Sequence, residues 1–253
     1  VGKLLAWRTR VQVNSGGCVW SSNQHVQAAE LGNANQNVST GLGLDIDARY
    51  AFTKISENEL EIIDNKALLF KTRNPDKYSI IPRHKIVSEN NGTYEVAVYW
   101  GLDEARVLRN LGVKNTPSPI TAKYKWVGRH KPFAHQIETA SFLTMNRRAF
   151  VFNDPGTGKT MSALWAADYL MKLKQVRRCL ILCPLSIMHD AWMHGVGKSV
   201  IHRSIIVAHH AQATRRIEMV QGDYEFVVVN YDGLNLIADE VVANGKFDLV
   251  IVD

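Results

Sequence analysis

Cysteine is scarce in this chain of 253 residues, and long apolar runs are absent. The three cysteines, Cys18, Cys179 and Cys183, have neither the spacing of a metal site nor the even number of a disulfide framework, which favours a reducing compartment. No apolar run approaches the roughly 20 residues of a membrane-spanning helix, and the N-terminus does not resemble a signal peptide. We therefore expect a cytoplasmic protein with no membrane partner.

The excess of positive over negative charge is also modest. The formal net charge is +6 at pH 7, an excess that permits contact with a polyanion without arguing for one. Apolar residues make up 46% of the chain, enough to bury a core and to exclude disorder throughout. The length suits one large domain or two smaller ones.

The most specific motif is the run Asn153-Asp154-Pro155-Gly156-Thr157-Gly158-Lys159-Thr160. It lies between an apolar strand pattern and a helical pattern, the context in which a glycine-rich loop cradles phosphates. Glycines allow backbone amides to turn towards an anion, and the new helix adds its free amides and positive dipole end. Lysine supplies a mobile charge for the β- and γ-phosphates, and threonine a hydroxyl for Mg²⁺. The loop therefore predicts binding of a nucleotide and Mg²⁺ at Asp154, Pro155, Gly156, Thr157, Gly158, Lys159 and Thr160, although Asn153 stands where the general pattern has glycine.

From residue 121 onward, apolar strand patterns alternate with helical ones. Near-continuous apolar runs such as 179–183 and 249–252 are typical of parallel strands covered on both faces. The pattern predicts an α/β fold with a doubly wound parallel sheet. We expect strands at 149–152, 178–183, 204–208, 225–229 and 247–252, and helices at about 134–145, 160–173, 186–195, 211–220 and 234–243.

Two regions precede this alternation. Residues 1–45 are polar and show no period, so we expect disorder there. Residues 46–120 predict a small β-rich accessory module with a hairpin, 67–70 and 78–81, around a turn at Asn74-Pro75-Asp76. This hairpin can face nucleic acid, or it can be a solvated basic edge that discourages strand aggregation. Its cations are Lys71, Arg73, Lys77, Arg83 and Lys85.

Four further segments flank the phosphate loop: Lys131-Pro132-Phe133-Ala134-His135-Gln136, Leu182-Cys183-Pro184-Leu185-Ser186, Val229-Asn230-Tyr231-Asp232 and Phe247-Asp248-Leu249-Val250-Ile251-Val252-Asp253. With the loop, they make residues 121–253 resemble the first RecA-like domain of superfamily 2 DNA helicases and translocases. The resemblance is to Swi/Snf-type ATPases, particularly those of bacteriophages. It implies a P-loop NTPase fold in a bacterial or phage-infected cell. It also removes the objection to Asn153, because this superfamily requires only the two later glycines.

The resemblance assigns roles to individual residues. Gln136 would read adenine, since an amide offers one donor and one acceptor to the base. Lys159 and Asp253 would be the catalytic residues, with Asp253 holding Mg²⁺ opposite Thr160 through water. DNA would meet Pro184, Ser186, Asn230 and Tyr231, although Asp232 can instead be a helix cap there. Trp192 matches a family tryptophan or is simply part of the core.

The resemblance also implies partners and alternatives. DNA is the expected partner, together with a second RecA-like domain downstream, because the chain ends within the Walker B motif, before the glutamate that orients water. We therefore expect a fragment that binds ATP better than it hydrolyses it. The predicted function is an ATP-dependent DNA helicase or translocase. The alternatives are a phage terminase-type DNA-packaging ATPase and a remnant that binds nucleotide or DNA without activity.

Overall fold

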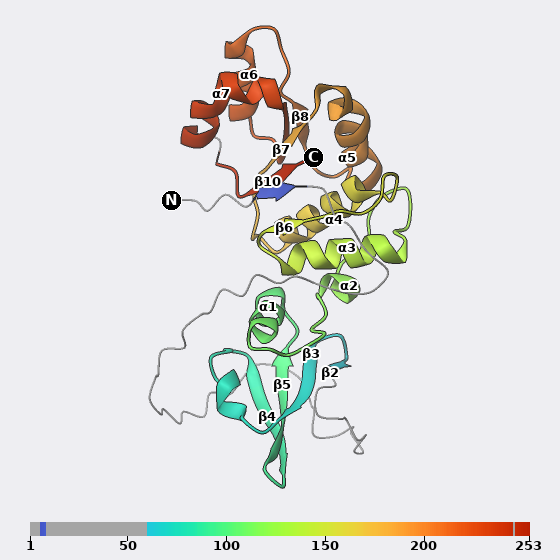
Figure 1. The fold of residues 1–253 in the computed structure, drawn as a ribbon, viewed down its shortest axis with the longest axis vertical. Helices are drawn as coiled ribbons and strands as arrows, with labels where there is room; N and C mark the ends of the chain where they lie inside the picture. The colour runs from blue at the N-terminus through green and yellow to red at the C-terminus, as the bar shows by residue number, and fades with distance from the viewer. Residues whose placement is uncertain (1–5, 9–59, 245) are drawn as a thin grey trace. The chain divides into compact units, whose positions relative to one another are not determined.

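The computed structural model describes residues 6–8, 60–244 and 246–253. The chain divides between Thr116 and Pro117 into two compact units, and Ala6–Arg8 belong with the C-terminal one (Figure 1). Each unit is described by itself. Most of the segment predicted to be disordered, and residues 46–59 of the predicted module, lie outside the described residues.

The N-terminal unit is built on a four-stranded antiparallel sheet. Its strands are β2 (Leu60–Ile63), β3 (Ala67–Thr72), β4 (His84–Asn90) and β5 (Thr93–Tyr99), in the order β2-β3-β5-β4. Strands β4 and β5 form a hairpin whose turn places Asn91 and Gly92 at positive φ, 50° and 73°, which these residue types tolerate. Helix α1 (Leu102–Asn110) follows β5. The unit therefore has its own sheet and a buried core that includes Leu68, Val96 and Val98.

The hairpin predicted around Asn74-Pro75-Asp76 is wrong. Pro75–Tyr78 form a 3₁₀ turn, and β3 pairs with β2 and β5 rather than with residues 78–81. The Tyr78 ring packs edge-on against Phe70, with ring centroids 4.8 Å apart. Burial of this aromatic side chain stabilises the turn more than pairing of a second strand would stabilise a hairpin here. Helix α1 begins at Leu102, so Asp103 lies within its first turn.

The C-terminal unit contains a six-stranded sheet in which every pairing is parallel. Its order is β6-β1-β10-β7-β9-β8. The strands are β1 (Ala6–Arg8), β6 (Ala149–Phe150), β7 (Cys179–Cys183), β8 (Ile205–Val207), β9 (Phe226–Asn230) and β10 (Leu249–Val252). The helices are α2 (Ile120–Lys123), α3 (Ala134–Met145), α4 (Lys159–Lys172), α5 (His194–Ser199), α6 (Ala213–Gln221) and α7 (Tyr231–Asn244).

Helices cover both faces of this sheet. Leu180, Val227 and Val250 pack with Val220 of α6 and Ile237 of α7. The alternate side chains Leu249 and Ile251 meet α4 on the other face, where they share a small void with Ala163, Ala166, Ala167 and Leu170. Figure 1 shows α6 and α7 on one side of the strands and α4 and α5 on the other. The predicted doubly wound α/β fold is confirmed, and the largely apolar central strands β7, β9 and β10 explain it.

Two local predictions in this unit need correction. Ala6–Arg8, predicted to be disordered, form β1 between β6 and β10. The single helix predicted at 186–195 is instead a 3₁₀ turn (Leu185–Ile187), a π-helical segment (Met188–Met193) and then α5. The π-helical segment buries Met188 and Trp192, which are four residues apart and lie on the same side of it.

Within the described part of the chain, no helix has the length and apolar character needed to cross a membrane.

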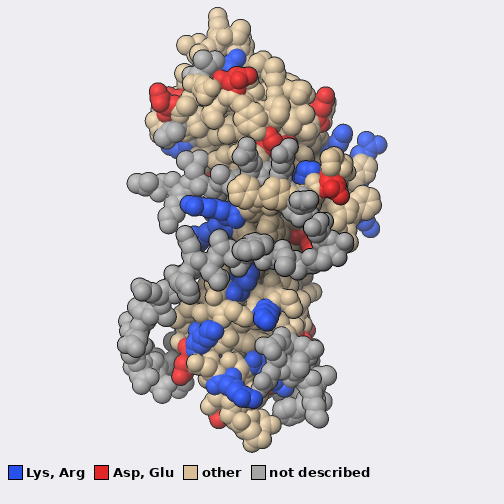
Figure 2. Space-filling view, viewed as in Figure 1, with Lys and Arg blue, Asp and Glu red and all other residues tan. Residues whose placement is uncertain are grey.

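Charged side chains on the N-terminal unit are only partly neutralised. Lys71 pairs with Glu95 at 3.4 Å, and Arg83 pairs with Glu104 and lies over the Tyr99 ring at 3.7 Å. Lys77 and Lys85 are exposed. Figure 2 shows Lys and Arg side chains gathered on the visible face of this unit. The cations predicted to form one basic edge are therefore dispersed, because Lys85 lies on the edge strand β4 whereas Lys71 lies on the interior strand β3.

Candidate nucleotide-binding site

The phosphate loop lies at the carboxyl end of β6 and leads directly into α4. Gly156 and Gly158 have φ values of 81° and 78°, in the left-handed region that favours glycine. Gly158 is the N-cap of α4, so the first amides of this 14-residue helix open into the loop. Thr157 closes a tight turn, donating from its backbone N–H and its hydroxyl to the carbonyl oxygen of Asp154. The local geometry is that of an anion cradle.

The side chain of Lys159 lies across this cradle. Its ammonium donates to the carbonyl oxygens of Asn153 and Asp154, each at 3.0 Å. These neutral acceptors hold the charge over the loop, where charged phosphate oxygens would bind it more strongly. Asn153, the departure from the general pattern, donates from its amide to the hydroxyl of Thr139 in α3 at 2.8 Å. The residue therefore ties the loop to a neighbouring helix.

Gln136 lies against the loop rather than pointing into solvent. Its Nε2 donates to the carbonyl of Thr157 at 3.2 Å, and its Oε1 accepts from the backbone N–H of Phe133 at 3.0 Å. His135, which the sequence analysis did not single out, also donates from Nε2 to the Thr157 carbonyl at 3.0 Å. Phe133 is 67% exposed, and its ring stacks on His135 with centroids 5.7 Å apart. An exposed aromatic pair and a glutamine amide thus border the loop, as an adenine site requires.

Asp253 follows β10 at the same edge of the sheet. Because β1 alone separates β6 from β10, their carboxyl ends are about 10 Å apart, two strand spacings. The Asp253 backbone N–H donates to Leu182 at 2.9 Å, and its Oδ2 accepts from the Trp192 indole N–H at 3.1 Å. The Tyr231 hydroxyl donates to its carbonyl oxygen.

The donor set at this edge fits ATP with Mg²⁺. Backbone amides and the Lys159 ammonium suit phosphate oxygens, and the Thr160 hydroxyl and Asp253 carboxylate are the oxygen ligands that Mg²⁺ prefers.

The residues predicted to contact DNA fall into two groups. Pro184 and Ser186 are exposed just beyond β7, and Tyr231 is 42% exposed at the start of α7. Asn230 is 5% exposed, and its Oδ1 accepts no hydrogen bond. The prediction that Asn230 contacts nucleic acid does not fit this burial. Asp232 lies within the first turn of α7, where its charge complements the helix dipole, rather than at the cap.

The sequence analysis missed a buried polar cluster around Asp168 of α4. Its carboxylate is fully buried and accepts from the Tyr124 hydroxyl at 2.6 Å, Arg203 Nε at 2.6 Å and His202 at 2.8 Å, with Lys172 at 3.1 Å. Burial acts to raise the pKa of Asp168, but the hydrogen bonds from Tyr124, Arg203 and Lys172 outweigh it, so this pKa is lowered. Burial and the Asp168 charge raise the pKa of Tyr124. Of these residues, only Asp168 could have been noticed in the sequence, as an acidic residue within the helix predicted at about 160–173.

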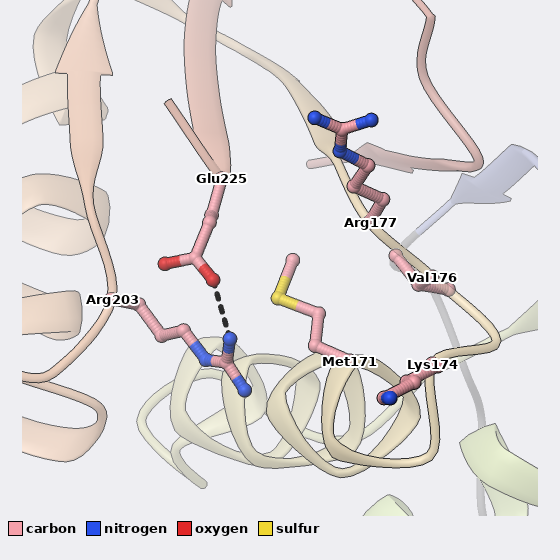
Figure 3. Close-up of a pocket in the computed structure, with 6 residues that line it drawn as sticks. All are labelled: Met171, Lys174, Val176, Arg177, Arg203 and Glu225. Carbon is pink, nitrogen blue, oxygen red and sulfur yellow. Dashed lines mark hydrogen bonds and ion pairs between the residues drawn. The ribbon is translucent and has the colours of Figure 1, made fainter. Parts of the chain in front are cut away.

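A cavity of about 340 Å³ opens at the opposite, amino-terminal edge of the sheet (Figure 3). Arg203 and Glu225 form an ion pair on one side, and Met171 points between them and Val176. The cavity is lined by Met171, Lys174, Val176, Arg177, Arg203 and Glu225. Three of these six residues are cations, so this cavity is a second place where an anion could bind, away from the phosphate loop.

Comparison with known families identifies the C-terminal unit. Residues 135–253 match the model of the SNF2-related domain. This segment is therefore similar to SNF2-related domains. The SNF2-related segment contains Gln136, the phosphate loop and Asp253, and the family predicted from the sequence is confirmed.

Among the solved structures that are similar to this chain is the SWI2/SNF2 ATPase core of Sulfolobus solfataricus in complex with double-stranded DNA. The two chains are 21% identical, with a TM-score of 0.43. The alignment covers 51% of this chain and 27% of that one, so the present chain spans little more than a quarter of its length. A comparison with curated proteins found no match.

Proposed function

We propose that residues 117–253 are the first motor domain of an ATP-dependent DNA translocase or helicase and that they bind MgATP and DNA. The observation that carries this proposal is the loop of residues 153–160. Its two glycines are at positive φ, its lysine lies over the cradle, and its last residues open a helix within an SNF2-related segment.

Each residue of the site has a role in holding the nucleotide. The amides of 156–160 and the α4 dipole would bind the phosphates, and Lys159 would exchange its two carbonyl partners for β- and γ-phosphate oxygens. Gln136 and the Phe133–His135 pair would border the adenine. Bound Mg²⁺ neutralises charge on the phosphates, and Thr160 and Asp253 would hold it there.

DNA would bind at the carboxyl edge of the same sheet. Pro184 and Ser186 are exposed after β7, beside backbone amides that suit phosphate oxygens. Tyr231 is exposed after the neighbouring strand β9. The SNF2-related match favours a translocase over a terminase-type packaging ATPase. ATPase activity that DNA stimulates, measured on the full-length protein, would separate an active motor from a remnant that binds nucleotide or DNA without activity.

The test is ATP affinity, measured by calorimetry in the presence of Mg²⁺. Lys159→Ala removes hydrogen bonds to charged phosphates worth about 1.5–3 kcal/mol each, so affinity should fall about tenfold or more. The matched control is Lys125→Ala, which removes an exposed lysine elsewhere in the unit and should leave affinity unchanged. Equal affinity in Lys159→Ala and wild type would contradict the proposal.

A further inference from the structure

Trp192 connects a π-helical segment on the surface of the C-terminal unit to the acid at the end of β10. It lies in the π-helical segment Met188–Met193 and is 1% exposed. Its indole N–H donates to Oδ2 of Asp253 at 3.1 Å, across 61 residues of sequence. A tryptophan buried only for its apolar ring needs some acceptor for this N–H, and here the acceptor is the carboxylate rather than a neutral carbonyl.

The backbone around Asp253 is fixed from two further directions. Its N–H donates to Leu182 of β7, and its carbonyl accepts from the Tyr231 hydroxyl. These bonds hold the main chain but leave the side-chain torsions undetermined. The indole bond of Trp192 acts on the carboxylate itself, so it restrains the position of Oδ2.

The hydrogen bond from the indole to a carboxylate is charge-assisted, and in this partly buried setting it is stronger than one to a neutral acceptor.

We infer that Trp192 is a positioning residue for the metal: its indole N–H holds the Asp253 carboxylate in the orientation that serves Mg²⁺ on bound ATP. The inference rests on the proposed function, because it concerns the same site. Removing a group that orients a metal-holding side chain typically lowers metal affinity about 10- to 100-fold.

The experiment measures how much Mg²⁺ strengthens ATP binding, as the ratio of the ATP dissociation constant in EDTA to that with Mg²⁺. In Trp192→Phe this ratio should fall about tenfold or more relative to wild type, while affinity for ATP in EDTA should stay the same. A variant that only damages packing would weaken ATP binding in EDTA and with Mg²⁺ alike and would leave their ratio unchanged. The ratio therefore separates a positioning role from a packing role.

Trp165→Phe is the matched control. Trp165 is also 1% exposed, and its indole N–H donates to the neutral carbonyl of Val127 at 2.9 Å. This substitution also removes an indole N–H, but it frees no carboxylate from a hydrogen bond. The ratio of ATP dissociation constants in EDTA and with Mg²⁺ should therefore equal that of wild type. A wild-type ratio in Trp192→Phe, or an equal loss in both variants, would overturn the inference. Wild-type protein that binds no ATP would instead contradict the proposed function.

A second measurement covers the case in which Trp192→Phe does not fold. In wild-type protein with ATP in EDTA, adding excess Mg²⁺ should shift the NMR resonance of the Trp192 indole N–H and leave that of Trp165 in place. An unmoved Trp192 resonance would overturn the inference.

Discussion

Asp168 is a fully buried carboxylate that the structure keeps ionised. Tyr124, His202 and Arg203 donate hydrogen bonds to it, and Lys172 pairs with it at 3.1 Å. Arg203 also pairs with Glu225, so one guanidinium joins two acids. Removing a single member of such a buried network leaves charges that the rest of the structure has already desolvated.

Asp168→Asn should therefore lower the free energy of unfolding by about 3 kcal/mol at pH 7. Urea unfolding followed by tryptophan fluorescence measures it, because Trp126 packs against Tyr124 and Trp165 packs against Trp126. As the exposed control, Asp103→Asn removes a surface pair with Arg106 and should change stability by less than about 0.5 kcal/mol.

The same variant has a predictable pH dependence. The pKa of Asp168 is lowered from 3.8 in the folded state, so its contribution is present above about pH 4 and is lost as pH falls through the folded pKa. The difference in free energy of unfolding between wild type and Asp168→Asn should decrease below about pH 4. A gap that stays constant from pH 7 to strongly acidic pH would contradict an ionised Asp168.

At the scale of elements, the turn from β6 into α4 depends on two glycines in different surroundings. A Cβ on Gly156 would meet no atom within 4 Å, whereas a Cβ on Gly158 would lie 2.1 Å from Nε2 of Gln136. Both have positive φ, so alanine carries backbone strain at either position. Only the change at Gly158 also displaces the glutamine that borders the loop.

Gly156→Ala should cost about 1–2 kcal/mol of stability from backbone strain alone. Gly158→Ala should cost more and should release the Gln136 side chain from Thr157. Thermal unfolding compares the stabilities, and the NMR resonances of the Gln136 side-chain amide report its release. Equal costs, with the amide resonances unmoved in Gly158→Ala, would show that Gln136 does not pack on the loop as described.

Most of the elements in the C-terminal unit could be predicted because their patterns are local. The apolar run of β7 and the helical period before Met145 each depend on neighbouring residues, and α3 begins and ends where the sequence indicates. Two features could not be predicted, because distant contacts determine them. The π-helical segment turns Trp192 towards Asp253, and Ala6–Arg8 pair with strands more than 140 residues away.

The candidate site was predictable to a similar extent. The loop motif specifies the identity of Gly156, Gly158 and Lys159, because the chemistry of phosphate binding demands them at fixed spacing. The burial of Asn230 and the contact of His135 with Thr157 depend on how α3 and β9 pack. Sequence spacing carries no information on either packing arrangement.

At the scale of the whole molecule, charge sets the expected behaviour with DNA. The net charge is +6, and two exposed cations of the N-terminal unit, Lys77 and Lys85, lie away from the SNF2-related segment in sequence. Phosphate contacts release counterions, so DNA affinity falls with salt in proportion to the number of such contacts.

Duplex DNA affinity should therefore fall at least about tenfold between 50 and 200 mM salt, as two phosphate contacts alone require. The double variant Lys77→Ala/Lys85→Ala should bind within about twofold of wild type, because we place the DNA on the C-terminal unit. Fluorescence anisotropy with a labelled duplex measures both. A large loss in the double variant would instead place the DNA on the N-terminal unit.

The central claim is that the bend between β6 and α4 holds the triphosphate. NMR titration of the amide-labelled chain with MgATP tests it most directly, because the structure offers two places for an anion. The account predicts that the largest shifts fall on the amides of residues 156–160. Shifts confined to Lys174, Arg177 and Arg203, around the cavity in Figure 3, with the loop unmoved, would contradict it.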